Sequence, residues 1–272
     1  MKKVLVVLNG IYTSTYVLNG AVNLAKETNA HLHAIFLNAD HNGKEGGYFF
    51  PNDLALTENI FTGESIAAEN EKMIDANVTM FQNDCETTGV SYTVDKRRRM
   101  ALKDLVDYSI YFDFILADSK ANFYQYFLSD ILVDAHCPVI LTSSDMKQTE
   151  DIILAYDNSP SSMYAIKMFS YLFPEWKNKQ LYLVHVNIDD EIGASYEDEI
   201  KGFLALRYPN VTVNVLHGKV QESLIEFVKS KSANSLVVMG AYGRSSLSRI
   251  FRSSLSKRVL ETTDASVFAT HV

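Results

Sequence analysis

The sequence predicts an α/β protein built from two tandem, doubly wound domains, each with a five-stranded parallel sheet and helices on both faces. Two observations indicate this fold. Short apolar runs rich in β-branched residues alternate with segments of helical periodicity along the chain. The order of these segments in the first half then recurs in the second half, as in a chain made of two copies of one unit.

The repeat is clearest at the start of each half. The apolar run 4–8 is followed by Asn9, and the run 152–156 is followed by Asp157, 148 positions later. The same offset relates two further pairs, Ser14 with Ser162 and Tyr16 with Tyr164. Four more expected strands have counterparts: 31–37 with 181–186, 90–94 with 211–215, 112–117 with 233–238, and 139–141 with 266–270.

A polar stretch without periodicity separates the two copies, so we place the first domain at residues 1–145 and the second at 150–272. The first domain carries extra chain at about 38–60. This insertion holds an aromatic patch at Tyr48-Phe49-Phe50, which either meets a partner or covers the core. The segment 60–85 that follows predicts a longer helix.

Composition and charge exclude several classes of protein. The 272 residues are 47% hydrophobic, which is enough to bury a core. A formal net charge of −8 argues against a general nucleic-acid binder, because phosphate neutralisation needs a basic surface. No apolar stretch approaches the length of a membrane span, and the apolar start of the chain stops at Asn9, too early for an export signal. We therefore expect a cytoplasmic protein that binds neither membranes nor nucleic acid.

The most informative stretch lies between residues 236 and 254. A buried-strand pattern ends at Gly240, and Gly243 follows in a loop that carries several serines and arginines. Backbone N–H groups at such a glycine turn before a helix form an anion site, so phosphate is the expected ligand. A plain strand-to-helix turn followed by a solvated basic helix is the alternative that the glycines alone leave open.

The two copies differ where a ligand would bind. At the carboxyl end of its first strand the second copy has the charged acceptor Asp157, whereas the first copy has the neutral Asn9. By this alignment, Gly240 and Gly243 are replaced in the first copy by Ser119 and Asn122. The first copy also lacks several residues of the following loop. The sequence thus indicates that the second half binds ligand and that the first half is degenerate.

These residues together resemble the universal stress protein family, and specifically its tandem-domain members. Three pieces carry the resemblance: the first strand and turn at 155–165, the second strand at 181–186, and the glycine pattern that starts at Gly240. ATP-binding members have glycine, two residues, glycine, nine residues, glycine, and then serine or threonine. Gly240, Gly243 and Ser254 match this pattern, whereas Ser253 replaces the last glycine. The resemblance implies the fold of the adenine nucleotide hydrolases, also called HUP-type.

The resemblance also implies a set of binding residues. Asp157 would accept a hydrogen bond from the base or the sugar, and Val186 would pack against the adenine. Arg244 or Arg252 would pair with phosphate oxygens. The whole predicted nucleotide-binding set is Asp157, Asn158, Ser159, Val186, Gly240, Gly243, Arg244, Arg252, Ser253 and Ser254. ATP is the expected ligand and Mg²⁺ its expected companion, although no protein ligand for the ion is evident beyond the hydroxyls and Asp157.

Family members join through their last strand, so we expect the two halves to pair within one chain as a pseudo-dimer. Two such chains can then associate as a homodimer. The last strand of each half would otherwise leave an exposed edge that invites pairing.

Two classes of function follow. The first is a stress-response or signalling module that binds ATP or another adenine nucleotide in its second half. The second is an interaction or scaffold protein of the same fold in which both sites are degenerate. An enzyme comes third, with at most slow ATP hydrolysis, because no second constellation positions an acceptor or a general base. Ser159 and Ser162 are better interpreted as caps of the next helix than as nucleophiles.

Overall fold

The structure is a computed structural model. It describes residues 1–37, 63–95, 100–120, 134–142, 145–147, 149–187, 197–240 and 255–270. The predicted insertion at about 38–60, with its aromatic patch, lies outside the described residues.

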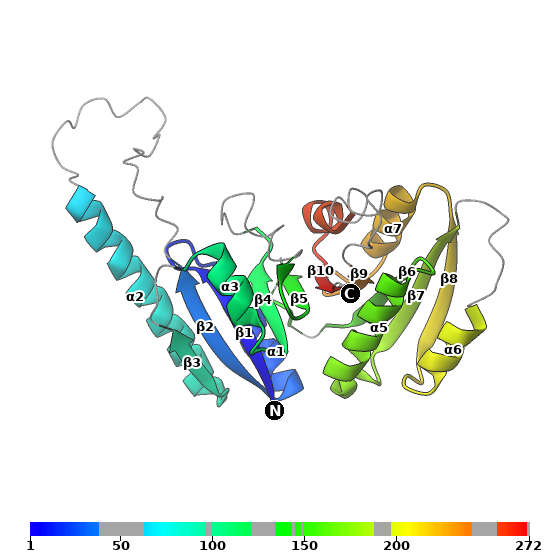
Figure 1. The fold of residues 1–272 in the computed structure, drawn as a ribbon, viewed down its shortest axis with the longest axis horizontal. Helices are drawn as coiled ribbons and strands as arrows, with labels where there is room; N and C mark the ends of the chain where they lie inside the picture. The colour runs from blue at the N-terminus through cyan, green and yellow to red at the C-terminus, as the bar shows by residue number, and fades with distance from the viewer. Residues whose placement is uncertain are drawn as a thin grey trace, which may run out of the picture.

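Helices and strands alternate through both halves, as the sequence predicts (Figure 1). The first half contains β1 (Lys2–Asn9), α1 (Thr15–Thr28), β2 (Ala30–Leu37), α2 (Gly63–Thr88), β3 (Tyr92–Asp95), α3 (Leu102–Ser109), β4 (Phe114–Asp118) and β5 (Val139–Thr142). The second half contains β6 (Asp151–Tyr156), α5 (Pro160–Leu172), the 3₁₀ turn η1 (Pro174–Trp176), β7 (Gln180–Asn187), α6 (Glu197–Ala205), β8 (Val211–His217), α7 (Val220–Lys229), β9 (Leu236–Gly240) and β10 (Ser266–Thr270). Residues 255–262 are also helical.

The strands form one ten-stranded sheet in the order β3-β2-β1-β4-β5-β10-β9-β6-β7-β8. Within each half the five strands are parallel, which confirms the predicted doubly wound arrangement. The halves meet where β5 pairs antiparallel with β10, so the expected pairing of the two last strands occurs inside the chain. The two five-stranded sheets therefore continue into one another, and this pairing leaves neither of those edges open.

One face of the sheet carries a single hydrophobic core that runs through both halves. Helices α1, α2, α5 and α6 supply its helical residues, such as Leu18, Phe81, Phe169 and Ile200. The opposite face has two smaller cores, one beneath α3 and one beneath α7 and the helix at 255–262. The predicted domain limits, 145 and 150, fall between β5 and β6 and stay a prediction, since the two halves share one sheet and one core.

Aromatic side chains pack the junction between the halves. Phe268 of β10 is fully buried and lies 5.9 Å from Phe169 and 6.0 Å from Phe173, centroid to centroid. Phe173 also stacks on Trp176 at 4.6 Å and contacts Phe114 of β4 at 5.4 Å. Residues of the second half thereby reach the core of the first, which couples the stability of the two.

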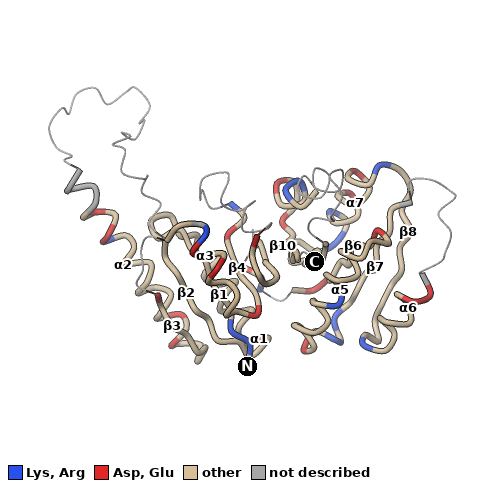
Figure 2. Tube along the Cα trace, viewed as in Figure 1, with Lys and Arg blue, Asp and Glu red and all other residues tan. Residues whose placement is uncertain are grey.

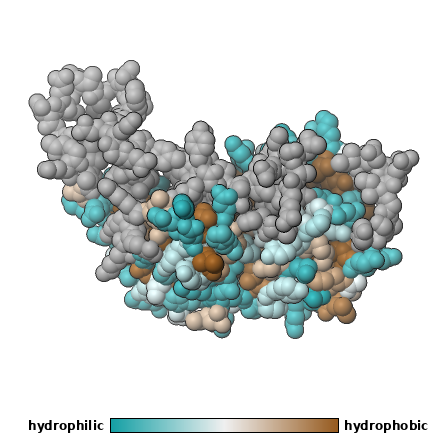
Figure 3. Space-filling view, in the orientation of Figure 1, coloured by the Kyte–Doolittle hydropathy of each residue, from teal (hydrophilic) through white to brown (hydrophobic). Residues whose placement is uncertain are grey.

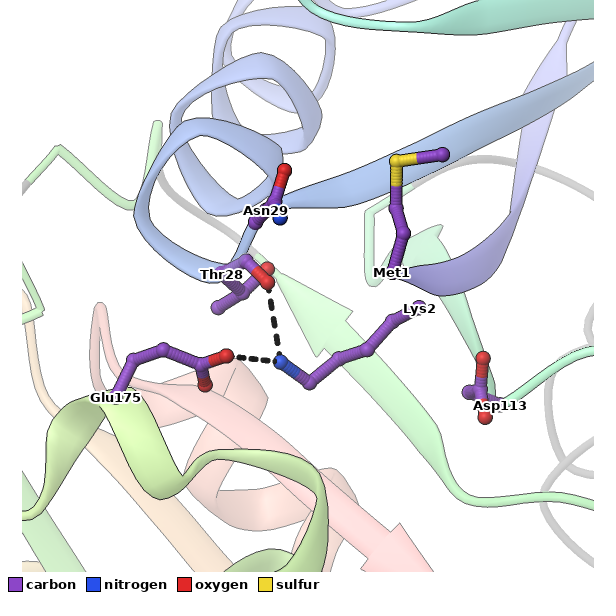
Figure 4. Close-up of a pocket in the computed structure, with 6 residues that line it drawn as sticks. All are labelled: Met1, Lys2, Thr28, Asn29, Asp113 and Glu175. Atoms are coloured by element: carbon purple, nitrogen blue, oxygen red, sulfur yellow. Dashed lines mark hydrogen bonds and ion pairs between the residues drawn. The ribbon is translucent and has the colours of Figure 1, made fainter.

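Polar contacts also join the two halves, near the surface beside the aromatic side chains. The Lys2 ammonium donates to the Thr28 carbonyl oxygen at 3.0 Å and pairs with Glu175 at 2.6 Å (Figure 4). These three residues line a shallow notch together with Met1, Asn29 and Asp113. The Trp176 indole N–H donates to Glu27 at 2.7 Å, and Lys179 lies 3.2 Å from the same carboxylate. The end of α1 is thus fastened to η1, the turn that follows α5.

The helix predicted at 60–85 appears as α2, a 26-residue helix. It covers β3 through contacts such as that of Phe81 with Tyr92, at 5.8 Å. Its counterpart α6 has only nine residues. Among the described residues, no helix is long and apolar enough to cross a membrane.

We predict that Phe268→Ala lowers the free energy of unfolding by about 3–5 kcal/mol, because it empties the centre of the junction. Chemical denaturation measures the change. The control is Tyr171→Ala, which truncates a side chain that is 56% exposed and should change stability little. A loss below about 1 kcal/mol for Phe268→Ala would contradict a shared core.

Candidate functional site

The candidate site lies at the carboxyl ends of β6 and β9. From β6 the chain continues to β7 and β8 on one side, and it then returns to place β9 on the other side of β6. The strand order therefore reverses between β6 and β9, which is where doubly wound sheets bind ligands. Asp157 directly follows β6, and Gly240 ends β9.

The turn after β6 is shaped by three of the predicted residues. The Asp157 carboxylate accepts from the backbone N–H of Ser159 at 3.1 Å and from its hydroxyl at 2.5 Å. Asn158 adopts a left-handed conformation with φ of 59°, which asparagine tolerates better than most residues. Asp157 and Asn158 are both exposed at the surface. The turn therefore presents a carboxylate to solvent at the carboxyl end of β6.

Ser159 caps α5, as predicted. Its hydroxyl oxygen accepts from the backbone N–H of Ser162 at 3.1 Å, and Pro160 occupies the first helical position. The start of a helix carries a partial positive charge and unsatisfied N–H groups. The residues that shape the turn thus also fix where this positive end lies.

Gly240 allows α5 to begin against the end of β9. A side-chain carbon at position 240 would lie 2.6 Å from the backbone C and O atoms of Ser161, closer than real contacts allow. The sequence predicts that this glycine belongs to a turn whose backbone N–H groups bind an anion. The structure supplies a different reason, since the missing side chain makes room for the first turn of the helix.

Val186 lies near the end of β7, half-buried, beside Leu216 of β8. The register pairs Tyr156 with His185, so Val186 follows at the level of Asp157. The His185 ring is held in place by a 2.9 Å hydrogen bond between Nδ1 and the Tyr156 carbonyl oxygen. Val186 therefore lies on the strand next to the turn, and its predicted contact with an adenine stays a prediction.

The structure thus brings five of the predicted residues together at the carboxyl ends of the strands: Asp157, Asn158, Ser159, Val186 and Gly240. The other five, Gly243, Arg244, Arg252, Ser253 and Ser254, lie outside the described residues. Their roles, and that of the loop that holds them, stay predictions.

The same place in the first half is filled by a carboxylate. Asp118 ends β4 and is only 2% exposed. It accepts from the Ser14 hydroxyl at 2.8 Å, from the Tyr16 hydroxyl, and from the Lys120 backbone N–H at 2.7 Å. A buried negative charge at this position opposes the approach of a phosphate group.

The sheet register corrects one alignment made from the sequence. Val4 of β1 lies opposite Phe114, and its counterpart Ile152 lies opposite Leu236. Four residues further along each strand come Asp118 and Gly240. The first-half counterpart of Gly240 is therefore Asp118 rather than Ser119, because the sequence alignment was one residue out of register.

The turn after β1 also differs from its counterpart, the turn after β6. The side-chain oxygen of Asn9 is used internally, accepting from the backbone N–H groups of Ile11 at 3.1 Å and Tyr12 at 3.0 Å. Asn9 is 3% exposed, whereas Asp157 faces the surface. Helix α1 begins at Thr15, the counterpart of Met163, so α5 begins three residues earlier relative to its strand.

The sequence did not reveal that the hydroxyls of Ser14 and Tyr16 bond to a common partner. Both were matched with the second copy, but their shared partner Asp118 was not foreseen. Burial and the hydrogen bond to Asp118 raise the pKa of Tyr16 well above the usual value for a phenol. The phenol therefore keeps its proton and remains a hydrogen-bond donor throughout the physiological pH range.

The described residues contain no group of three or more His, Cys, Asp or Glu that could hold a metal ion. His31 and His33, which alternate on β2, bond instead to Ser91 and Thr93 at 2.7 Å. An Mg²⁺ companion of ATP stays a prediction.

Comparison with known proteins supports the fold and gives a family match for part of the chain. The family model of the universal stress protein family matches residues 188–271. Residues 188–271 belong to the universal stress protein family.

Solved structures extend the likeness to the whole chain. A universal stress protein from Archaeoglobus fulgidus DSM 4304 is similar with a TM-score of 0.72 and 18% identity, over 99% of this chain and 96% of that one. A functionally unknown protein from Pseudomonas aeruginosa PAO1 is similar with a TM-score of 0.64 and 15% identity, over 100% of this chain and 92% of that one. At these identities the likeness establishes the fold. No curated protein matches the chain.

The universal stress protein match begins after β7 and includes β9, Gly240 and β10, the elements that form one side of the candidate site. Asp157 and the cap of α5 lie before it. The two sides of the site are therefore supported differently, one by the family model and the other by the repeat and the fold.

We predict that Gly240→Ala destabilises the protein by about 1–3 kcal/mol, because the added methyl group must displace the first turn of α5. The control is Gly202→Ala in α6, where an added carbon would meet nothing within 4 Å. That change should instead stabilise the helix, by about 0.5–1 kcal/mol. Thermal or chemical unfolding measures both, and equal effects at the two glycines would contradict the close approach.

Proposed function

We propose that this chain is a universal stress protein that binds one adenine nucleotide in its second half. The observation that carries the proposal is the start of α5, seated against Gly240 beside the exposed Asp157. A helix start attracts phosphate, and a carboxylate accepts from sugar hydroxyls or from the amino group of a base. The two features suit the two ends of a nucleotide.

The contrast between the halves favours one site per chain. Asp118 fills the position of Gly240 and uses the two hydroxyls at the start of α1. A phosphate group there would have to displace a buried carboxylate that accepts three hydrogen bonds. We therefore assign no nucleotide to the first half.

The role of the bound nucleotide follows from the fold only in outline. The Ser159 hydroxyl, which donates to Asp157, is used as the cap of α5, so binding rather than turnover is the proposed activity. A stress-response or signalling module, whose state depends on the nucleotide, is the function that this supports best.

Calorimetric titration of the nucleotide-stripped chain with ATP and Mg²⁺ tests the proposal. We expect one site per chain, and at least tenfold weaker binding in Asp157→Ala, a loss of about 1.4 kcal/mol. Asp104→Ala, which removes an exposed carboxylate from α3 in the first half, is the matched control and should leave the affinity unchanged. GTP should bind more weakly if the base is read as adenine.

Absence of binding at millimolar ATP would refute the proposal. The chain would then be better described as an interaction or scaffold protein of the same fold. Two sites per chain would instead contradict the role given to Asp118.

A further inference from the structure

Strand β8 ends the sheet, and among the described strands it pairs only with β7. Its seven residues, Val-Thr-Val-Asn-Val-Leu-His, include no proline and no Lys, Arg, Asp or Glu (Figure 2). Proteins usually protect an edge strand with charges, proline, a bulge or short length. None of these devices is present in β8.

The opposite edge of the sheet is protected. Strand β3 has four residues and ends in Asp95. The α2 helix lies beside it, and Glu86 of that helix accepts a 2.7 Å hydrogen bond from the Tyr92 hydroxyl. Strands β3 and β8 occupy equivalent places in the two repeats. The exposed edge of β8 is therefore specific to the second repeat.

Two valines of β8 are exposed on one face of the strand. Val213 is 36% and Val215 is 47% exposed, whereas Val211 packs partly against the core beneath α6. The nine-residue α6 buries Ile200 and Leu204 but leaves the carboxyl end of β8 uncovered. Hydrophobic residues reach the surface in both halves of the molecule, including this one (Figure 3).

The side chain on the other face, between the valines, has an unsatisfied group. The Asn214 side-chain oxygen is buried and has no hydrogen-bond partner in the structure. A buried acceptor without a donor is unfavourable, so a rearrangement that gives this oxygen a donor is favoured.

The direction of the backbone N–H and C=O groups determines which residues of β8 can form hydrogen bonds with an added strand. The Leu181 N–H of β7 donates to the Asn210 carbonyl oxygen at 2.9 Å. Backbone groups alternate sides along a strand, so those of Asn214 face β7 and those of Val213 and Val215 face outward. An added antiparallel strand would bond to the two valines.

We propose that β8 pairs with β8 of a second copy of this chain, antiparallel and centred on Asn214. In this register Val213 lies opposite Val215 of the second copy, as a hydrogen-bonded pair, and the four exposed valines meet on one face. Asn214 lies opposite its own copy as a non-hydrogen-bonded pair, the arrangement in which side chains are closest. Rotation of the Asn214 side chain out of its buried position would let each amide N–H₂ donate to the unsatisfied oxygen of the other.

Self-pairing fits this strand better than a charged partner does. A two-fold axis at Asn214 places residues equally far before and after it opposite one another, so a strand that carries charges of one sign would repel its copy, and β8 carries no Lys, Arg, Asp or Glu. The chain already joins its two repeats by antiparallel pairing of uncharged edges, β5 with β10. The interface is small, so we expect a dimer that dissociates on dilution.

Sedimentation of the full chain over a range of concentrations tests the proposal. We expect reversible dimerisation, and a dissociation constant at least tenfold higher in the double variant Val213→Lys/Val215→Lys, which sets like charges opposite each other. Val213→Glu/Val215→Lys sets opposite charges across the same register and should restore the dimer. Leu206→Lys, at a side chain that is 84% exposed outside β8, is the control and should change nothing.

A cross-link tests the register itself. Under mild oxidation Asn214→Cys should form a disulfide-linked dimer, whereas Thr212→Cys, which faces Leu216 of the second copy, should form far less. A chain that is monomeric at all concentrations, or a dimer that survives Val213→Lys/Val215→Lys, would overturn the proposal. These measurements need no nucleotide, so their outcome is independent of the proposed function.

Discussion

The rest of the structure depends on the contact between Gly240 and the first turn of α5. Because no side chain lies between them, Ser161 reaches the end of β9 and the helix starts at the point where the strand order reverses. The positive end of α5, its Ser159 cap and the exposed Asp157 are all placed by this one approach. In the first half the same position holds Asp118, which draws Ser14 and Tyr16 onto itself and closes the site. We propose that this exchange of glycine for aspartate contributes most to the difference between a half that receives an anion and one that does not.

The joining of the two halves has a second consequence. Pairing of β5 with β10 turns two five-stranded sheets into one, and the aromatic cluster around Phe173 extends one core across the junction. The edges that remain are β3 and β8. Since β3 is short and bordered by α2, further association is directed to β8, at the end of the half that carries the candidate site. Nucleotide binding and chain association would then reside in the same half.

Much of the fold could be predicted from the sequence, because strand and helix periodicity are local and the repeat supplies each half with a check on the other. The turn at Asp157 and the cap at Ser159 followed from residue types with strong local preferences. What could not be predicted depends on contacts between distant segments. Examples are the one-residue shift that pairs Asp118 with Gly240, the bonds from Ser14 and Tyr16 to Asp118, and the need for glycine opposite Ser161. Strand register and helix approach decide these, and one sequence carries little information about either.

The central claim is that the two halves, built on one plan, differ in what their helix starts can receive. Backbone amide NMR of the full chain during addition of ATP and Mg²⁺ tests it directly. The account predicts that the amide signals of Ser159, Ser161 and Ser162 shift in a saturable manner, while those of Thr13, Ser14 and Tyr16 do not move. Equal shifts in both sets, or shifts confined to the first half, would contradict the account.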